Sequence, residues 1–281
     1  MDRYFARSLA KNTLIHIFLM AVAVSCLFPL FWMVRCSLMT NQTIFLDHRL
    51  WPRDIHWSNY LAALVQGNFG VYFLNSVFYA AAVVFGIVVI SSLAAFAFSR
   101  LHFPGRDVLF TLFVAAMMIP LPGSFVPLFT MMSKLGWANT RFGYILCMIN
   151  VGLSLSILLL KTFFDKMPSD LEDAARIDGC NRLQIWWHVA LPIARPAIAV
   201  VVIYNSLNVW NEFILANLLL NDKNLMPLQT GLMAFSGANQ VDYPVLMAGL
   251  TMTAMPIVVV YFLMQKNIVR GLTSGARWVG I

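Results

Sequence analysis

The chain has 281 residues, of which 60% are hydrophobic and 11% are charged, and its mean hydropathy is +0.76. These values exclude a soluble globular domain and indicate an integral membrane protein with room for about six spans. The net charge of +7 comes from basic residues scattered between apolar runs, so it reflects membrane topology and excludes a nucleic-acid-binding tract.

Six apolar runs follow one another and predict an all-α, polytopic membrane protein with about six transmembrane helices. The first run is too long for a signal peptide, which favours an uncleaved span. Pro120, Pro122 and Pro127 interrupt the third run and predict a broken helix that lines a cavity or is covered by protein. Residues 1–281 are therefore expected to form one transmembrane domain, with spans at roughly residues 13–34, 72–98, 108–132, 142–160, 193–220 and 245–269.

The basic residues predict the topology, because cytoplasmic loops carry the excess of Lys and Arg. With both termini in the cytoplasm, the basic residues left outside are Arg49, Arg53, Lys134, Arg141 and Lys223. The larger set inside consists of Arg3, Arg7, Lys11, Arg100, Arg106, Lys161, Lys166, Arg176, Arg182, Arg195, Lys266, Arg270 and Arg277. Arg35, at the outer end of the first span, fits either set.

A polar stretch, residues 168–192, separates the fourth and fifth runs. Ser169 and Glu172 have the spacing of a capping box, which predicts a helix that starts directly after Ser169. Gly179 can adopt the left-handed conformation that ends a helix, and Asn181 can cap a second one. The stretch is therefore predicted to form a cytoplasmic helix, a tight turn and a second helix, too polar to lie in lipid.

Part of this stretch combines small, acidic and apolar residues at a fixed spacing: Asp173, Ala174, Ala175, Gly179, Val189, Leu191 and Pro192. It resembles the EAA loop of ABC importer permeases, which reads E-A-A, three residues, G, nine residues and I-x-L-P. Asp173 replaces the usual Glu and Val189 the usual Ile, and both changes are conservative. By this resemblance, residues 165–192 form coupling helices that dock on a cytoplasmic ATPase subunit. The alternative is an ordinary amphipathic helix-turn-helix between two spans.

The resemblance assigns ATPase coupling to Glu172, Asp173, Ala174, Ala175, Asp178, Gly179, Leu191 and Pro192. The two alanines are small enough to let a partner surface approach. The three acids either pair with basic groups of the ATPase or serve as partners of the helix dipole. Apolar surface for docking is expected from a set of residues some of which must instead pack on the spans: Leu171, Ile177, Leu183 and Trp186.

The fifth run carries polar groups that are costly inside a membrane. They are Asn205, Asn208, Asn211 and Glu212, and the spacing predicts that Asn205, Asn208 and Glu212 share one helix face. Such a face either lines the translocation path or hydrogen-bonds to neighbouring helices and holds the bundle together. The sequence leaves both interpretations open.

Two further segments, Asn75-Ser76 and Trp210 to Phe213, resemble the smaller permease of maltose-type carbohydrate importers. This resemblance covers most of the chain and implies a place in a bacterial plasma membrane. It also implies a second similar permease, two ATPase subunits and an extracytoplasmic solute-binding protein as partners, besides lipid. Sugars, oligosaccharides or glycerol phosphates are the substrates that it implies.

The chain carries no signature of an enzyme. No Gly is followed by Lys, so a phosphate-binding Walker A loop is absent, and ATP-Mg is expected on the partner ATPase. The five His and four Cys show no metal-binding spacing, so no cofactor is expected on this chain. Two other functions stay open: an ABC permease for another small solute, and an ion-coupled secondary transporter that uses Glu212.

Overall fold

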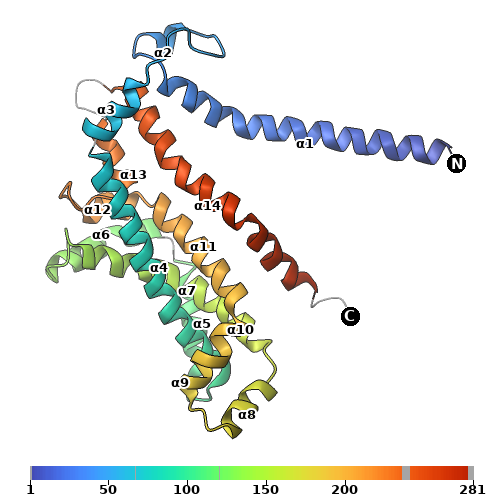
Figure 1. The fold of residues 1–281 in the computed structure, drawn as a ribbon. Helices are drawn as coiled ribbons and strands as arrows, with labels where there is room; N and C mark the ends of the chain where they lie inside the picture. The colour runs from blue at the N-terminus through green and yellow to red at the C-terminus, as the bar shows by residue number, and fades with distance from the viewer. Residues whose placement is uncertain (1, 67, 120, 236–240, 278–281) are drawn as a thin grey trace. The chain divides into compact units, whose positions relative to one another are not determined.

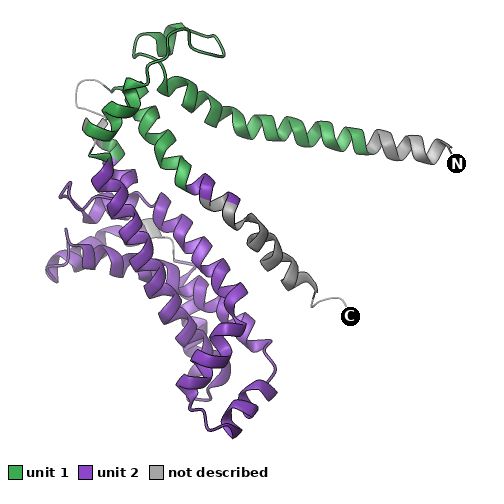
Figure 2. Ribbon diagram, viewed as in Figure 1, with its two compact units in different colours: residues 1–69, 232–256 green, residues 70–231, 257–281 purple. Residues whose placement is uncertain are grey.

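The computed structural model of the chain describes residues 2–66, 68–119, 121–235 and 241–277, and its elements are all helices (Figure 1). The predicted all-α fold is therefore confirmed. The chain divides into two compact units, residues 1–69 with 232–256 and residues 70–231 with 257–281 (Figure 2).

Each predicted span corresponds to one helix or to two consecutive helices. The first, second and fourth are α1 (Asp2–Ser37), α4 (Phe69–Arg100) and α7 (Arg141–Asp165). The third, fifth and sixth are α5 (Arg106–Ala116) with α6 (Leu121–Lys134), α11 (Arg195–Asn211) with α12 (Ile214–Leu219), and α14 (Tyr243–Arg277). Short helices lie between them: α2 (Thr43–Leu46), α3 (Ser58–Gln66), α8 (Asp170–Ile177), α9 (Arg182–Ile185), α10 (Leu191–Ile193) and α13 (Leu228–Gly231).

Length and composition separate these spans into two groups. Among the described residues, Asn12–Ser37, α4 and α7 are long and apolar enough to cross a membrane alone. The pair Arg182–Ile193 and Arg195–Asn211 passes the same test as one span bent by 78°. The third span is broken between α5 and α6, as its prolines predict, although Pro120 itself lies outside the described residues. Residues 278–281 of the C-terminal tail also lie outside them.

In the first unit, Arg35 fastens the end of α1 to the loop that follows it. Its side chain is fully buried and stacks on the Trp32 ring, with 4.4 Å from Cζ to the ring centroid. Its Nε donates to the carbonyl of Arg49 at 2.6 Å, and a terminal nitrogen donates to that of Asp47 at 2.5 Å. Arg35 therefore belongs to neither topological set, because its charge is used to fold the loop.

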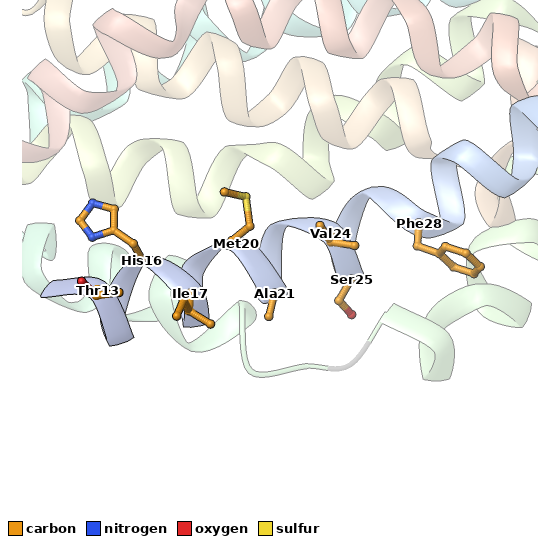
Figure 3. A pocket seen from close by; sticks show the side chains of 8 residues that line it. All are labelled: Thr13, His16, Ile17, Met20, Ala21, Val24, Ser25 and Phe28. Carbon is orange, nitrogen blue, oxygen red and sulfur yellow. The ribbon is translucent and has the colours of Figure 1, made fainter. Parts of the chain in front are cut away.

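The rest of α1 presents an exposed face. Side chains from residue 12 to residue 32 are exposed. One stripe of them recurs every three or four positions and mixes small, polar and apolar groups (Figure 3): Thr13, His16, Ile17, Met20, Ala21, Val24, Ser25 and Phe28. A stripe of this composition suits close packing against another membrane helix.

The core of the second unit lies where α4, α7 and α11 meet. Tyr79 of α4 and Tyr144 of α7 are fully buried and pack edge to face, with 4.7 Å between their ring centroids. At Gly152 the helices approach so closely that a Cβ atom would lie 2.4 Å from Asn205 Oδ1. Gly86 has the same role on α4, because a Cβ there would lie 2.5 Å from the Ile149 side chain.

The start of α4 holds the segment that follows α12. Asn75 donates to the carbonyls of residues 224 and 226, at 2.8 and 3.1 Å. The Ser76 hydroxyl accepts from the backbone N–H of Leu228 at 2.8 Å, and the Tyr79 hydroxyl donates to the carbonyl of Leu225 at 2.7 Å. The Asn75-Ser76 pair therefore anchors residues 224–228, at the end of this unit remote from α8 (Figure 1).

Candidate functional site

Residues 165–192, called the coupling segment from here on, form the predicted helix, turn and helix. α8 begins at Asp170, directly after Ser169 as predicted. The predicted capping box does not form, because Ser169 has helical backbone angles, φ −63° and ψ −31°, and its side chain makes no capping hydrogen bond. A capping residue needs extended angles. Glu172 instead turns away from the helix start and is buried.

The turn and the second helix form as the sequence predicts. Gly179 has φ +85°, the left-handed conformation that ends α8. Asn181 Oδ1 accepts from the backbone N–H of Gln184 at 2.9 Å, and Gln184 Oε1 accepts from that of Asn181 at 2.8 Å. This reciprocal pair is a complete capping box for α9.

Glu172 pairs with Arg100 at the end of α4. Arg100 Nε lies 3.0 Å from Glu172 Oε1, and their side chains are only 14% and 8% exposed. The approach is an ion pair by distance, without hydrogen-bond geometry at these two atoms. Arg100 also donates to the backbone carbonyls of Phe164 and Met167, where α7 ends. Three segments therefore converge on one guanidinium group.

Large apolar side chains of the coupling segment are exposed among polar ones. Ile177 is 87% exposed and Leu183 66%, as a docking surface requires. Trp186 is 9% exposed and packs in the core of its own unit, whereas its neighbour Trp187 is 60% exposed. Neighbouring residues of a helix point in different directions, and here Trp187 is the one that faces outward. The large apolar side chains that the coupling segment exposes are Leu171, Ile177, Leu183 and Trp187, and we refer to them together as the docking patch.

The remaining predicted coupling residues divide between the surface and the core. Ala175 is buried and Leu191 packs against the core, so both hold the segment to its own unit. Asp173 is exposed and pairs with Arg176 at 3.4 Å. Those that lie exposed beside the docking patch are Ala174, Asp178, Gly179 and Pro192.

A sharp bend joins the coupling segment to the fifth span. α9 continues into a π-helix at Trp186–Ala190 and then into α10, and the axis turns by 78° before α11. The turn centres on Ala194, which is fully buried. Prolines at the starts of α10 and α11 suit such a junction, because their missing N–H groups are not needed there.

The structure divides the polar residues of the fifth span. Asn205 is 2% exposed and donates to Ser156 Oγ of α7 at 3.0 Å and to the carbonyl of Val201 at 2.8 Å. Asn208 and Asn211 are exposed, and each donates only to the carbonyl four residues earlier among the bonds described. Asn205 therefore holds two helices together, and the predicted common face with Asn208 is wrong.

Glu212 ends α11 and caps α12. Its carboxylate accepts from the backbone N–H groups of Leu215 and Ala216, at 2.6 and 2.9 Å, and from the Tyr144 hydroxyl at 3.3 Å. The face prediction assumed a continuous helix, but the chain becomes extended at Glu212. Glu212 directly precedes the apolar run 213–216, and an acidic residue just before such a run is the signal that predicts this contact with a helix start.

The exposed polar stripe of α11 keeps Asn208 and Asn211 of the predicted path residues but not Asn205 or Glu212. Tyr204, Asn208 and Asn211 are exposed and spaced four and three apart. Tyr204 was missed, although its position completes the helical repeat. Among the described residues, no group of three or more His, Cys, Asp or Glu could hold a metal ion.

Comparison with known proteins gives consistent matches. Residues 86–274 match the family described as binding-protein-dependent transport system inner membrane component. The chain is 34% identical over 265 residues to the probable ABC transporter permease protein YurM of Bacillus subtilis, covering 94% of this chain and 88% of that protein. It is also 34% identical over 270 residues to the trehalose/maltose transport system permease protein MalG of Thermococcus litoralis, covering 95% and 96%.

A solved structure has the same fold. It belongs to a bacterial ABC transporter involved in the import of the acidic polysaccharide alginate. The match has a TM-score of 0.81 and 26% sequence identity, and it covers 91% of this chain and 95% of that chain.

Proposed function

The chain belongs to the family of binding-protein-dependent transport system inner membrane components, and from this membership we propose that it is a permease subunit of an ABC importer for a sugar or oligosaccharide. The named relatives support the substrate class, since they include permeases for trehalose/maltose, diacetylchitobiose and maltodextrin. The permease is a single transmembrane unit of residues 1–281 with no ATPase site of its own.

The coupling segment carries this proposal. It presents the docking patch outward while Ala175, Trp186 and Leu191 pack inward. A patch of large apolar side chains on a short polar helix-turn-helix is unfavourable in water unless a partner covers it. We assign it to a cytoplasmic ATPase subunit, whose movement on binding ATP-Mg would be passed to α7 and α11 through the two ends of the segment.

The exposed polar stripe of α11 is the part of the translocation path that we assign to this chain. Tyr204, Asn208 and Asn211 suit sugar rings, because an aromatic ring stacks on them and amide groups bond to hydroxyls. Asn205 and Glu212 hold the stripe in position. Asn205 fixes α11 to α7, and Glu212 accepts hydrogen bonds at the start of α12.

The complex that we propose contains this permease, a second similar permease, two ATPase subunits and an extracytoplasmic solute-binding protein. The exposed stripe of α1 supports a membrane partner, since lipid or a helix of the second permease would cover it. The excess of basic residues on one side supports a bacterial plasma-membrane protein with both termini in the cytoplasm.

Reconstitution tests this proposal. The chain is expressed together with the permease, ATPase and binding protein encoded beside it, and the purified complex is placed in proteoliposomes. A ligand screen on the binding protein, with maltose, trehalose, chitobiose and glycerol phosphate, selects the labelled solute. Uptake should require ATP and the binding protein. Uptake that continues without the ATPase subunits would contradict the proposal and favour a secondary transporter.

The contacts of Glu212 weigh against that alternative. An ion-coupling carboxylate must exchange its partners during transport, whereas Glu212 accepts two backbone hydrogen bonds that start a helix. Replacing these bonds by a bound ion would unwind the first turn of α12.

A further inference from the structure

α4 and the coupling segment are far apart in the sequence, yet one side chain joins them. Arg100, the last residue of α4, forms the 3.0 Å ion pair with Glu172 of α8. The same guanidinium group donates to the carbonyls of Phe164 and Met167. The guanidinium group presents several donors in a fixed fork, so it can serve an acid and two carbonyls together.

Burial makes this junction strong. Neither Arg100 nor Glu172 is more than 14% exposed, so water screens their attraction weakly. The carbonyls that end α7 carry the negative end of its helix dipole, which adds to the attraction for a cation. Removing the charge of Glu172 leaves Arg100 buried without its counterion, which is the costly way to break such a pair. Removing the charge of Arg100 leaves Glu172 with only the exposed Arg176, whose nearest side-chain nitrogen lies 3.8 Å away.

A second contact fixes α4 to α7 beside this junction. The Ser99 hydroxyl donates to Asp165 Oδ1 at 2.7 Å, and Lys161 Nζ lies 2.8 Å from Asp165 Oδ2. Phe96 and Phe164 pack edge to face just before it, with 6.0 Å between their ring centroids. The ends of α4 and α7 are therefore held together by several groups, and Arg100 extends this attachment to α8.

We propose that Arg100 is a positioning residue for coupling, which makes α4 move with the coupling segment when the ATPase subunits move it. The inference rests on the proposed function. Covalent continuity passes a movement of the segment only to α7 and α11. The contacts of Ser99 and Phe96 attach α4 to α7, and the Arg100–Glu172 pair attaches it directly to α8 as well. The other end of α4 holds residues 224–228.

The first test measures coupling in the reconstituted complex. Glu172→Gln keeps the shape of the side chain and removes its charge. Uptake per ATP hydrolysed should fall by about fivefold or more, the lower end of typical coupling between sites. Asp107→Asn is the matched control, because Asp107 forms an ion pair of the same 3.0 Å with its neighbour Arg106 but is exposed and joins no second helix.

The arginine variants separate positioning from stability. Arg100→Met should lower uptake per ATP hydrolysed as Glu172→Gln does. Arg100→Lys should restore part of that uptake per ATP, because it keeps the positive charge without the forked guanidinium group. A role in stability alone would lower the amount of assembled complex and leave uptake per ATP unchanged, which would overturn the inference. If the wild-type complex shows no ATP-driven uptake at all, the proposed function fails instead.

The second test follows the two helices directly. His102 and Asp170 are exposed and lie beside Arg100 and Glu172. In the full complex, spin labels at His102→Cys and Asp170→Cys, with Cys26, Cys36, Cys147 and Cys180 replaced by Ser, report the distance between α8 and the residues directly after α4. The distance should stay constant with and without ATP and should become nucleotide-dependent in Glu172→Gln. A distance that changes with ATP in the parent, or that stays constant in the variant, would overturn the inference.

Discussion

The side-chain amide of Asn205 donates to the Ser156 hydroxyl at 3.0 Å, across a contact where Gly152 leaves no space for a side chain. Both α7 and α11 are attached to the coupling segment, so this contact joins the helix before the segment to the helix after it. The polar group thus stabilises the bundle and is not free to bind a solute.

Gly152→Ala should destabilise the protein because its new methyl group would lie 2.4 Å from both Asn205 Oδ1 and Ile87 Cδ1. Overpacking of this kind costs about 1–3 kcal/mol. Thermal unfolding in detergent, followed by size-exclusion chromatography, measures the effect. Gly123→Ala is the control, since it lies in a helix with nothing within 4 Å of its Cβ, and it should be neutral or slightly stabilising. Equal melting of the two variants would contradict the close approach.

Glu212→Ala and Asn211→Ala should affect different properties, although the residues are neighbours. Glu212→Ala removes the cap of α12, which costs about 0.5–2 kcal/mol, and should reduce the amount of assembled complex. Asn211→Ala removes an exposed amide whose described hydrogen bond stays within its own helix, so stability should persist while uptake falls. Chromatography and sugar uptake measure the two properties on the same samples. Normal assembly with lost uptake in Glu212→Ala would return that residue to the translocation path.

Gly179→Val should weaken coupling between ATP hydrolysis and uptake. A β-branched residue at φ +85° is strained by roughly 1–2 kcal/mol, so the turn between α8 and α9 should change shape. Gly105→Val is the control, because Gly105 has φ +81° and, like Gly179, nothing within 4 Å of an added Cβ. Both variants therefore have the same strain, and only the one in the coupling segment should lower uptake per ATP. An equal loss in both would show that strain alone is responsible.

Replacing each of the two neighbouring tryptophans should affect a different property, ATPase binding for one and stability for the other. Trp187→Ala removes an exposed ring of the docking patch and should reduce the ATPase that co-purifies with the membrane subunits while their melting temperature stays the same. Trp186→Ala removes a buried ring and should cost about 3–5 kcal/mol of stability. Pull-down and thermal unfolding distinguish the two effects. Full ATPase retention by Trp187→Ala would contradict the assigned patch.

Local signals in the sequence predicted local structure well. The turn at Gly179 and the cap at Asn181 depend on a few consecutive residues, and both form as predicted. The order of apolar runs predicted the helices because burial in lipid depends on composition over a single segment. The broken third span also followed from its own prolines.

The predictions that failed concern contacts between distant segments. Glu172 has the spacing of a capping box, but the partner that decides its position, Arg100, lies on another helix. The face shared by Asn205 and Glu212 assumed unbroken helical repeats, and the chain leaves the helix at Glu212. Spacing along one segment cannot reveal which neighbour a polar side chain meets once the helices pack.

α4 has 32 residues, which makes a rod about 48 Å long at roughly 1.5 Å per residue. Asn75 and Ser76 attach one end of this rod to residues 224–228, and Arg100 attaches the other to α8. Such a rod transmits in both directions. By thermodynamic linkage, a protein that binds residues 224–228 and prefers one position of the rod must change the affinity of α8 for its partner. Binding of that partner at α8 must change the affinity of residues 224–228 for the protein by the same factor.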